Sequence, residues 1–236
     1  MKKFDINIVQ GISTLEYADV NIIIDVIRAF TVSYYAFQAG VGKIILVSTE
    51  EEANRIKKEN YVTSGEVNGY KIESFDFGNS PYDISKAELH KKNLLQRTTN
   101  GVKVTLSSLN ADHIFVTGFI NSLSLVNYIK FLRAGSQKEI FKVNIIASHP
   151  SGQDDYACAN YIKKHLLDKC MNHKLCDEEI VYKIIKSDAA QKFFEEKNLD
   201  FSINDIIMSL SIENSNFVME VNKNNEYVEI HKRIQL

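Results

Sequence analysis

The chain has 236 residues, of which 44% are hydrophobic and 25% are charged, as is ordinary for a globular domain. Lys and Arg number 28 against 30 Asp and Glu, so the formal charge of -2 gives no basic footprint for nucleic acid. The apolar runs are too short to span a bilayer, and the opening MKKFDINIVQG lacks a signal-peptide core. We therefore expect a cytoplasmic protein that binds neither nucleic acid nor membranes; homo-oligomer formation stays open.

Five apolar runs predict buried strands, and a helical pattern follows each of them. The strands are Val20–Val26, Lys43–Thr49, Lys92–Thr98, Asp112–Gly118 and Phe141–Ser148, and the helices cover residues 28–40, 51–60, 101–109, 121–135 and 154–170. Strands rich in Val, Ile and Leu without polar alternation are buried on both faces of a sheet. The strand-then-helix order therefore predicts a three-layer α/β fold, with a mostly parallel sheet and helices on both faces.

The C-terminal third has a different pattern. Short helices are predicted over residues 178–186, 189–197 and 203–212, as a helical cap or outer layer. A hairpin is predicted over residues 217–233, with its turn at Asn222–Asn225. Because the chain has no repeat, low-complexity segment or obvious linker, we expect one domain over residues 1–236.

The cysteines are few and odd in number: Cys158, Cys170 and Cys176. Cys170, His173 and Cys176 form a C-x-x-H-x-x-C pattern, but a closed metal site needs a fourth ligand and no partner cluster follows. We expect ordinary reduced thiols.

Polar residues collect where the predicted strands end. Asp25 and Arg28 lie at the end of the first strand, Asn121 lies just beyond the fourth, and Asp154 and Asp155 follow the fifth. Ligands of open parallel sheets bind beyond the carboxyl ends of the strands. Carboxylates suit Mg²⁺, and an arginine suits phosphate or sulfonate. The alternatives are a structural Asp25–Arg28 salt bridge or N-cap pair, and acids at 154 and 155 that only complement a helix dipole.

Two further stretches permit a structural and a ligand-binding interpretation. Thr98–Gly101 (TTNG) lies between a strand and a helix, where backbone N–H groups can bind an anion or simply form a capped turn. Ser64–Pro81 combines acids, glycines and the order Asp76-Phe-Gly-Asn79-Ser-Pro, which indicates a ligand loop or a surface hairpin. Both interpretations stay open, and no Walker motif for a nucleotide occurs.

Together these stretches resemble the 2-phosphosulfolactate phosphatase family. The matching segments are Asp25–Thr31, Gly65–Pro81, Thr98–Gly101, Gly118–Asn121 and Asp154–Ala159, which occur in the family's order. The most specific part is D-x-G-N-S-P followed by T-T-N-G. The sequence departs from the family where Ser74 replaces glycine, Val102 replaces threonine and Asp154 replaces glutamate. The last change favours Asp155 over Asp154 as a site residue.

The resemblance implies a magnesium-dependent phosphatase of coenzyme M biosynthesis that hydrolyses 2-phospho-3-sulfolactate, a small multiply anionic substrate. It implies Asp25, Asp76 and Asp155 as ligands of Mg²⁺ or groups that orient water. These three join Arg28 and Asn79 as candidate catalytic residues. The candidate substrate-binding residues are Arg28, Glu66, Thr99, Asn100, Gly101 and Asn121. The alternative is a non-catalytic anion-binding or regulatory protein on the same fold.

Overall fold

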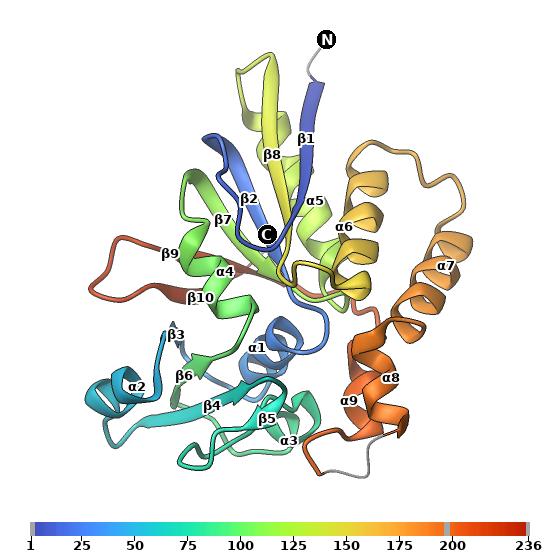
Figure 1. The fold of residues 1–236 in the computed structure, drawn as a ribbon. Coiled ribbons are helices and arrows are strands. Elements are labelled where there is room, and N and C mark those ends of the chain that lie inside the picture. Colours follow the sequence, from blue (N-terminus) through green and yellow to red (C-terminus); the bar gives the residue numbers. More distant parts are fainter. Residues whose placement is uncertain (1–2, 196–198, 235–236) are drawn as a thin grey trace.

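The computed structural model describes residues 3–195 and 199–234, and its strands form one extended mixed sheet. Across the described residues the strand order is β1-β8-β2-β7-β9-β10-β3-β6-β4-β5. The strands are β1 (Lys3–Gln10), β2 (Ala18–Ile24), β3 (Ile44–Leu46), β4 (Tyr61–Val67), β5 (Tyr70–Lys71), β6 (Asn93–Arg97), β7 (Ala111–Thr117), β8 (Ile140–Ala147), β9 (Phe217–Asn222) and β10 (Glu229–Ile234). With helices on both sides, the sheet confirms the predicted three-layer α/β fold (Figure 1).

The sheet contains two parallel blocks. Strands β1, β8, β2 and β7 run parallel, as do β3, β6 and β4. The β9–β10 hairpin joins the blocks because β9 pairs antiparallel with β7 and β10 pairs antiparallel with β3. The predicted hairpin is therefore confirmed, and it lies in the middle of the sheet (Figure 1).

All five predicted buried strands are present, as β2, β3, β6, β7 and β8, with ends shifted by one to three residues. Three further strands were not predicted. β1 lies at one edge of the sheet and its side chains alternate in exposure, so it lacks a continuous apolar run. β4 and β5 form part of the segment that the sequence marks as a hairpin or ligand loop.

Nine helices are assigned within the described residues. They are α1 (Ala29–Gln38), α2 (Glu50–Ile56), α3 (Pro81–Ser85), α4 (Gly101–Ser107), α5 (Ser122–Gly135), α6 (Gln153–Leu166), α7 (His173–Ile185), α8 (Asp188–Glu195) and α9 (Ile203–Ser209). α1 and α4 pack in one apolar cluster, and α5, α6 and α7 pack in another. Ile23 of β2 enters the first cluster, whereas Ile22 and Ile24 enter the second, because successive side chains of a strand point to opposite faces.

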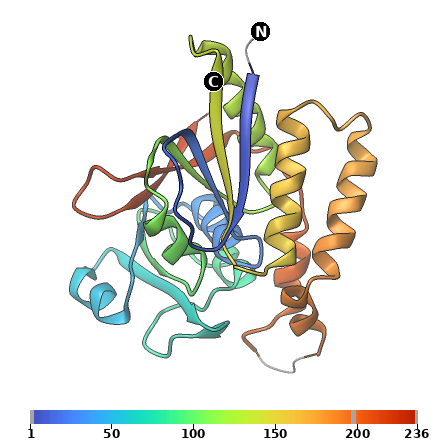
Figure 2. The same cartoon turned by 45° about the horizontal axis from the view of Figure 1, so that its top comes forward.

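The predicted C-terminal helices are α7, α8 and α9, although residues 196 and 197 of the second prediction lie outside the described part. α8 and α9 share a small apolar cluster of Ala190, Phe193, Phe201 and Ile206. α8 packs on α6 and α7, and α9 packs on α3, so this pair lies beside the main sheet (Figure 2). Of the helices described, none has the length and apolar character to cross a bilayer.

The structure corrects the expectation of reduced thiols. A disulfide joins Cys170, in the connection between α6 and α7, to Cys176, in α7, with their Cα atoms 6.4 Å apart. Cys158 is a buried free cysteine. The short connection folds the two cysteines to within disulfide reach, which their spacing alone did not establish.

Candidate active site

The site begins where β2 and β8 end side by side. The amide of Asp25 donates to the carbonyl of Thr117 at 3.2 Å, and that of Ser148 donates to the carbonyl of Ile24 at 2.9 Å. These bonds extend the parallel pairing of β7, β2 and β8 by one residue. Asp25 and Ser148 are thereby fixed next to each other at the carboxyl edge of the sheet.

Asp154 and Asp155, in the first turn of α6, bring two more carboxylates to this edge. Asp155 accepts from the amide of Val26 through Oδ1 at 2.8 Å. The hydroxyl oxygen of Ser148 lies 2.9 Å from Asp155 Oδ2 and 3.1 Å from Asp25 Oδ2. Asp25 also accepts from the amide of Ala29 at 2.8 Å and so holds the start of α1, whereas the N-cap residue itself, Arg28, makes no side-chain cap.

All three carboxyl groups are buried and repel one another. Burial, followed by the charge of Asp155, raises the pKa of Asp25 to about 7. Burial and neighbouring acids likewise raise the pKa of Asp154 and of Asp155. No Lys, Arg or His of the described chain forms an ion pair with any of them. Burying several unpaired carboxylates lowers the stability of the folded protein unless they are protonated or bind a cation.

Gly101 packs directly against Asp25. A Cβ atom at this position would lie 2.7 Å from Asp25 Oδ2 and 2.9 Å from the Cβ of Ala29. Gly101 is outside the cavity lining, which corrects its expected contact with substrate. Glycine is needed here because any side chain would displace the Asp25 carboxylate.

A cavity of about 400 Å³ opens beside the three acids. The predicted site residues that line it are Asp25, Arg28, Glu66, Asn79, Thr99, Asn100 and Asp155. Asn79 is the most informative of these, because its side chain is buried and its Oδ1 has no hydrogen-bond partner in the described structure. An unpaired buried acceptor beside a cavity indicates a missing donor or cation.

Glu66 and Thr99 line the cavity but are hydrogen-bonded to each other. Glu66 accepts from the amide of Thr99 at 2.5 Å, from the Thr99 hydroxyl at 2.9 Å and from the amide of Gly69 at 2.6 Å. The expectation that the Thr99 amide binds an anion is therefore corrected, since Glu66 already accepts its hydrogen. Asn100 makes no side-chain cap at the start of α4, and it is one of the residues that line the cavity.

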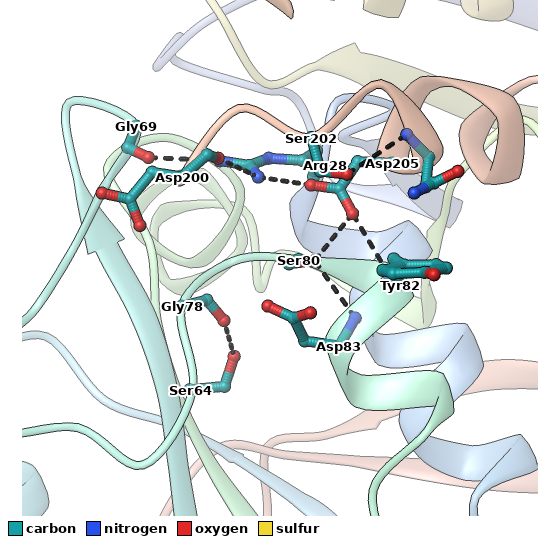
Figure 3. Close-up of polar contacts among 11 residues, drawn as sticks. Arg28, Ser64, Gly69, Gly78, Ser80, Tyr82, Asp83, Asp200, Ser202 and Asp205 are labelled. Carbon is teal, nitrogen blue, oxygen red and sulfur yellow. Dashed lines mark hydrogen bonds and ion pairs between the residues drawn. The ribbon is translucent and has the colours of Figure 1, made fainter. Parts of the chain in front are cut away.

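Arg28 lines the cavity and pairs with an acid that the sequence did not suggest. Its Nη1 lies 2.7 Å from Asp205 Oδ2, and both side chains are buried (Figure 3). The alternative of an Asp25–Arg28 salt bridge does not hold, because Asp25 has no ion pair among the described contacts. Arg28 instead connects the end of β2 with α9 in the C-terminal third.

Asp76 and Asn121 do not reach this cavity, which corrects two expectations. Asp76 forms an ion pair with Lys57 at 2.9 Å and accepts from the amide of Thr63 at 2.8 Å, so it joins the loop to β4. Burial acts to raise its pKa, but the hydrogen bonds from Lys57 and Thr63 outweigh it and hold that pKa below its usual value. Asn121 is fully buried and accepts from the Thr117 hydroxyl at 2.9 Å.

Several residues at the site were missed or discounted from the sequence. Asp154 lines the cavity, although its replacement of glutamate argued against it. The others are Ser148, His149, Lys192, Phe193 and Phe201 in the lining and Asp205 behind it. The position of Ser148 at a strand end was a usable signal. The sequence carried no signal for the site residues of α8 and α9, because short amphipathic helices are common and do not show which cavity they line.

Buried acids and an arginine line one cavity at the carboxyl edge of an α/β sheet, which is where enzymes with such sheets bind their substrates. The family model for 2-phosphosulpholactate phosphatase matches residues 6–224. A "Probable 2-phosphosulfolactate phosphatase" of Bacillus subtilis (strain 168) is 41% identical over 94% of this chain and 95% of its own. The chain therefore belongs to the 2-phosphosulfolactate phosphatase family.

More distant relatives carry the same name. The protein of Clostridium novyi (strain NT) is 34% identical over 60% of this chain and 60% of its own. That of Thermotoga maritima is 32% identical over 61% of each chain. The resemblance noted in the sequence is thus confirmed.

Proposed function

We propose that the protein is a Mg²⁺-dependent phosphatase that hydrolyses 2-phospho-3-sulfolactate, or a similar small multiply anionic phosphomonoester, to sulfolactate and phosphate. The observation that carries this proposal is the group of three buried acids, Asp25, Asp154 and Asp155, with no cationic partner in the described chain. The names of the matching family and of the relatives support the choice of substrate. The proposal includes a cytoplasmic location, inferred from the composition of the sequence, and a role in coenzyme M biosynthesis, inferred from the family resemblance.

The residues fit a magnesium ion. Mg²⁺ prefers oxygen ligands and is usually held by one or two carboxylates together with water and substrate oxygens. Asp25, Asp154 and Asp155 would hold it, and the unpaired Oδ1 of Asn79 is a further oxygen at the cavity. Mg²⁺, when bound, would offset the charge on the phosphoryl oxygens and on the leaving oxygen.

The other residues bind and orient the substrate. Three of the five N–H donors of Arg28 are used within the protein, which leaves two without a partner among the described residues. Two donors on one planar group suit a phosphate or sulfonate. Asn100 lines the same cavity, and Ser148 holds the carboxylates of Asp25 and Asp155 in a fixed relation.

Phosphate release tests the proposal. Purified protein is assayed with 2-phospho-3-sulfolactate and a panel of phosphomonoesters, with Mg²⁺ and with EDTA. We expect Mg²⁺-dependent release that EDTA abolishes and that is fastest with the sulfonated substrate. Binding of inorganic phosphate without turnover of any ester would overturn the proposal and favour the alternative, a non-catalytic anion-binding protein.

A further inference from the structure

The C-terminal third holds the guanidinium of Arg28 from several sides. Nη1 donates to Asp205 Oδ2 and to the carbonyl of Asp200, each at 2.7 Å, and Nη2 donates to the carbonyl of Gly69 at 3.1 Å (Figure 3). Arg28 is only 4% exposed and Asp205 is fully buried. Asp205 lies 177 positions away along the chain, so only tertiary folding brings this pair together.

The second oxygen of Asp205 holds the loop that carries Asn79. Asp205 Oδ1 accepts from the hydroxyl of Ser80 at 2.7 Å and from the amide of Tyr82 at 3.2 Å (Figure 3). Ser80 in turn accepts from the amide of Asp83 and thereby caps α3. Since Ser80 directly follows Asn79, one carboxylate fixes two groups that line the cavity.

Two aromatic rings enclose the guanidinium. The Arg28 Cζ atom lies 4.8 Å from the centre of the Phe193 ring and 5.7 Å from that of the Phe201 ring. The two rings meet edge to face at 5.2 Å, and both line the cavity. They remove water from the ion pair, so its charges interact more strongly and the plane of the guanidinium is fixed.

We infer that Asp205 is a positioning residue that orients Arg28, and through Ser80 also Asn79, toward the anionic groups of the substrate. This inference rests on the proposed function. A buried ion pair adds little stability compared with an apolar pair of the same volume. This pair is better explained by the geometry it imposes, because Arg28 lines the cavity and keeps two N–H donors without a partner among the described residues. The C-terminal helices α8 and α9 are then part of the active site.

A double-mutant cycle separates positioning from a purely structural role. We expect Asp205→Asn to lower kcat/KM by about 10–100-fold, the usual range for loss of an outer partner that orients a site residue. In an Arg28→Ala background the same change should alter kcat/KM by no more than about twofold, because Arg28 is gone and the amide oxygen of asparagine can still accept from Ser80 and Tyr82. An equal loss in both backgrounds, or no loss in either, would overturn the inference.

Glu229→Gln is a matched control. Glu229 is also a buried carboxylate and pairs with Lys43 at 2.5 Å, but it lies on β10 and outside the cavity lining. We expect it to lower the melting temperature without changing kcat/KM. If Asp205→Asn does not fold, Ser80→Ala is the second variant: it removes one hydrogen bond to Asp205 and the cap of α3 but leaves the Arg28–Asp205 pair in place. It should lower kcat/KM by a smaller factor, with or without Arg28, because it acts through Asn79, and no loss would overturn the Asn79 part of the inference.

Phosphate binding distinguishes failure of the inference from failure of the proposed function. Calorimetric titration with inorganic phosphate reports on Arg28 without any turnover. If the wild-type protein binds phosphate but hydrolyses no ester, the proposed function fails. The positioning role then survives only if Asp205→Asn weakens binding and this effect disappears in Arg28→Ala. Equal binding by the wild-type protein and Asp205→Asn, or none by either, overturns the inference.

Discussion

The two acidic regions that the sequence treats as one site differ in their neighbours. Asp25, Asp154 and Asp155 are buried together, and burial raises the pKa of each. Asp76 instead has Lys57 and Thr63 as partners, and their hydrogen bonds hold its pKa low against the opposing effect of burial. Among the described residues, no Lys, Arg or His pairs with the first group, whereas Asp76 pairs with Lys57.

The difference shows that the neighbours of a carboxylate in the folded protein, and not the sequence motif that contains it, decide whether it can bind a metal ion. A buried acid with no cationic partner has a strong reason to bind a metal ion, because binding removes the cost of its charge. An acid that already neutralises a lysine and accepts from a backbone amide stabilises a loop. The following substitutions test this contrast from the largest expected effect to the smallest.

Asp155→Asn is the harshest test of the acidic group. We expect kcat to fall by about 10²–10³-fold, the range for loss of one group that stabilises developing charge. In the absence of Mg²⁺ the melting temperature should change little, because relief of charge repulsion opposes loss of the bond from the His149 amide to Oδ2. Steady-state kinetics and a thermal melt measure both quantities. Near-wild-type kcat would remove Asp155 from the chemistry.

Arg28→Lys tests the anion-binding side of the same cavity. Lysine keeps the charge and can pair with Asp205, but it loses the planar arrangement of donors, so we expect kcat/KM to fall by about 10²-fold. Stability should also fall, by about 1–3 kcal/mol, because one of the carbonyls of Asp200 and Gly69 loses its donor. Unchanged kcat/KM with lowered stability would make Arg28 a structural residue.

Mg²⁺ itself should stabilise the folded protein through the acidic group. At a hundredfold excess over its Kd, a ligand raises the free energy of unfolding by about 2.7 kcal/mol. For a chain of this size that corresponds to a rise in Tm of roughly 5–10 °C. The shift should shrink sharply in Asp154→Asn and in Asp155→Asn. Melts at constant ionic strength, with NaCl replacing MgCl₂, measure it, and an equal shift in the variants would point to another site.

Much of the fold could be predicted because its strands are local signals. The runs that became β2, β7 and β8 are buried on both faces, and their polar ends mark the carboxyl edge of the sheet. The insertion of the β9–β10 hairpin between two parallel blocks could not be predicted, because strand pairing depends on distant residues.

The candidate site divides in the same way. Asp25 directly follows β2, and Asp155 lies in the first turn of the helix after β8, so their approach followed from the parallel pairing of these strands. The role of Asp205 depends on a contact with Arg28 across most of the chain, and no local pattern reports it. Asp76 was placed wrongly for a related reason: its turn motif is visible in the sequence, but the direction of its side chain toward Lys57 is not.

Asp76→Asn sharpens the contrast from its other side. The structure favours the turn interpretation, so kcat and the dependence on Mg²⁺ should stay within about twofold of wild type, as for a site with no shared partners. Stability should fall by about 1 kcal/mol, because the bonds from Lys57 and Thr63 weaken when the charge is lost. A Mg²⁺ titration of activity, together with a thermal melt, decides between the turn interpretation and the metal-ligand interpretation. Joint loss of kcat and Mg²⁺ affinity would restore Asp76 to the metal site.

Replacement of the cysteines should have the smallest effect on activity. None of Cys158, Cys170 and Cys176 lines the cavity, and a hard ion with oxygen ligands has no use for sulfur. The Cys170–Cys176 disulfide closes a short loop, so its removal should cost about 2 kcal/mol of stability. We therefore expect the variant with Cys158→Ala, Cys170→Ser and Cys176→Ser to melt earlier and to keep wild-type kcat. Phosphate release below the melting temperature measures this, and an inactive but folded variant would contradict a site built only from oxygen and nitrogen groups.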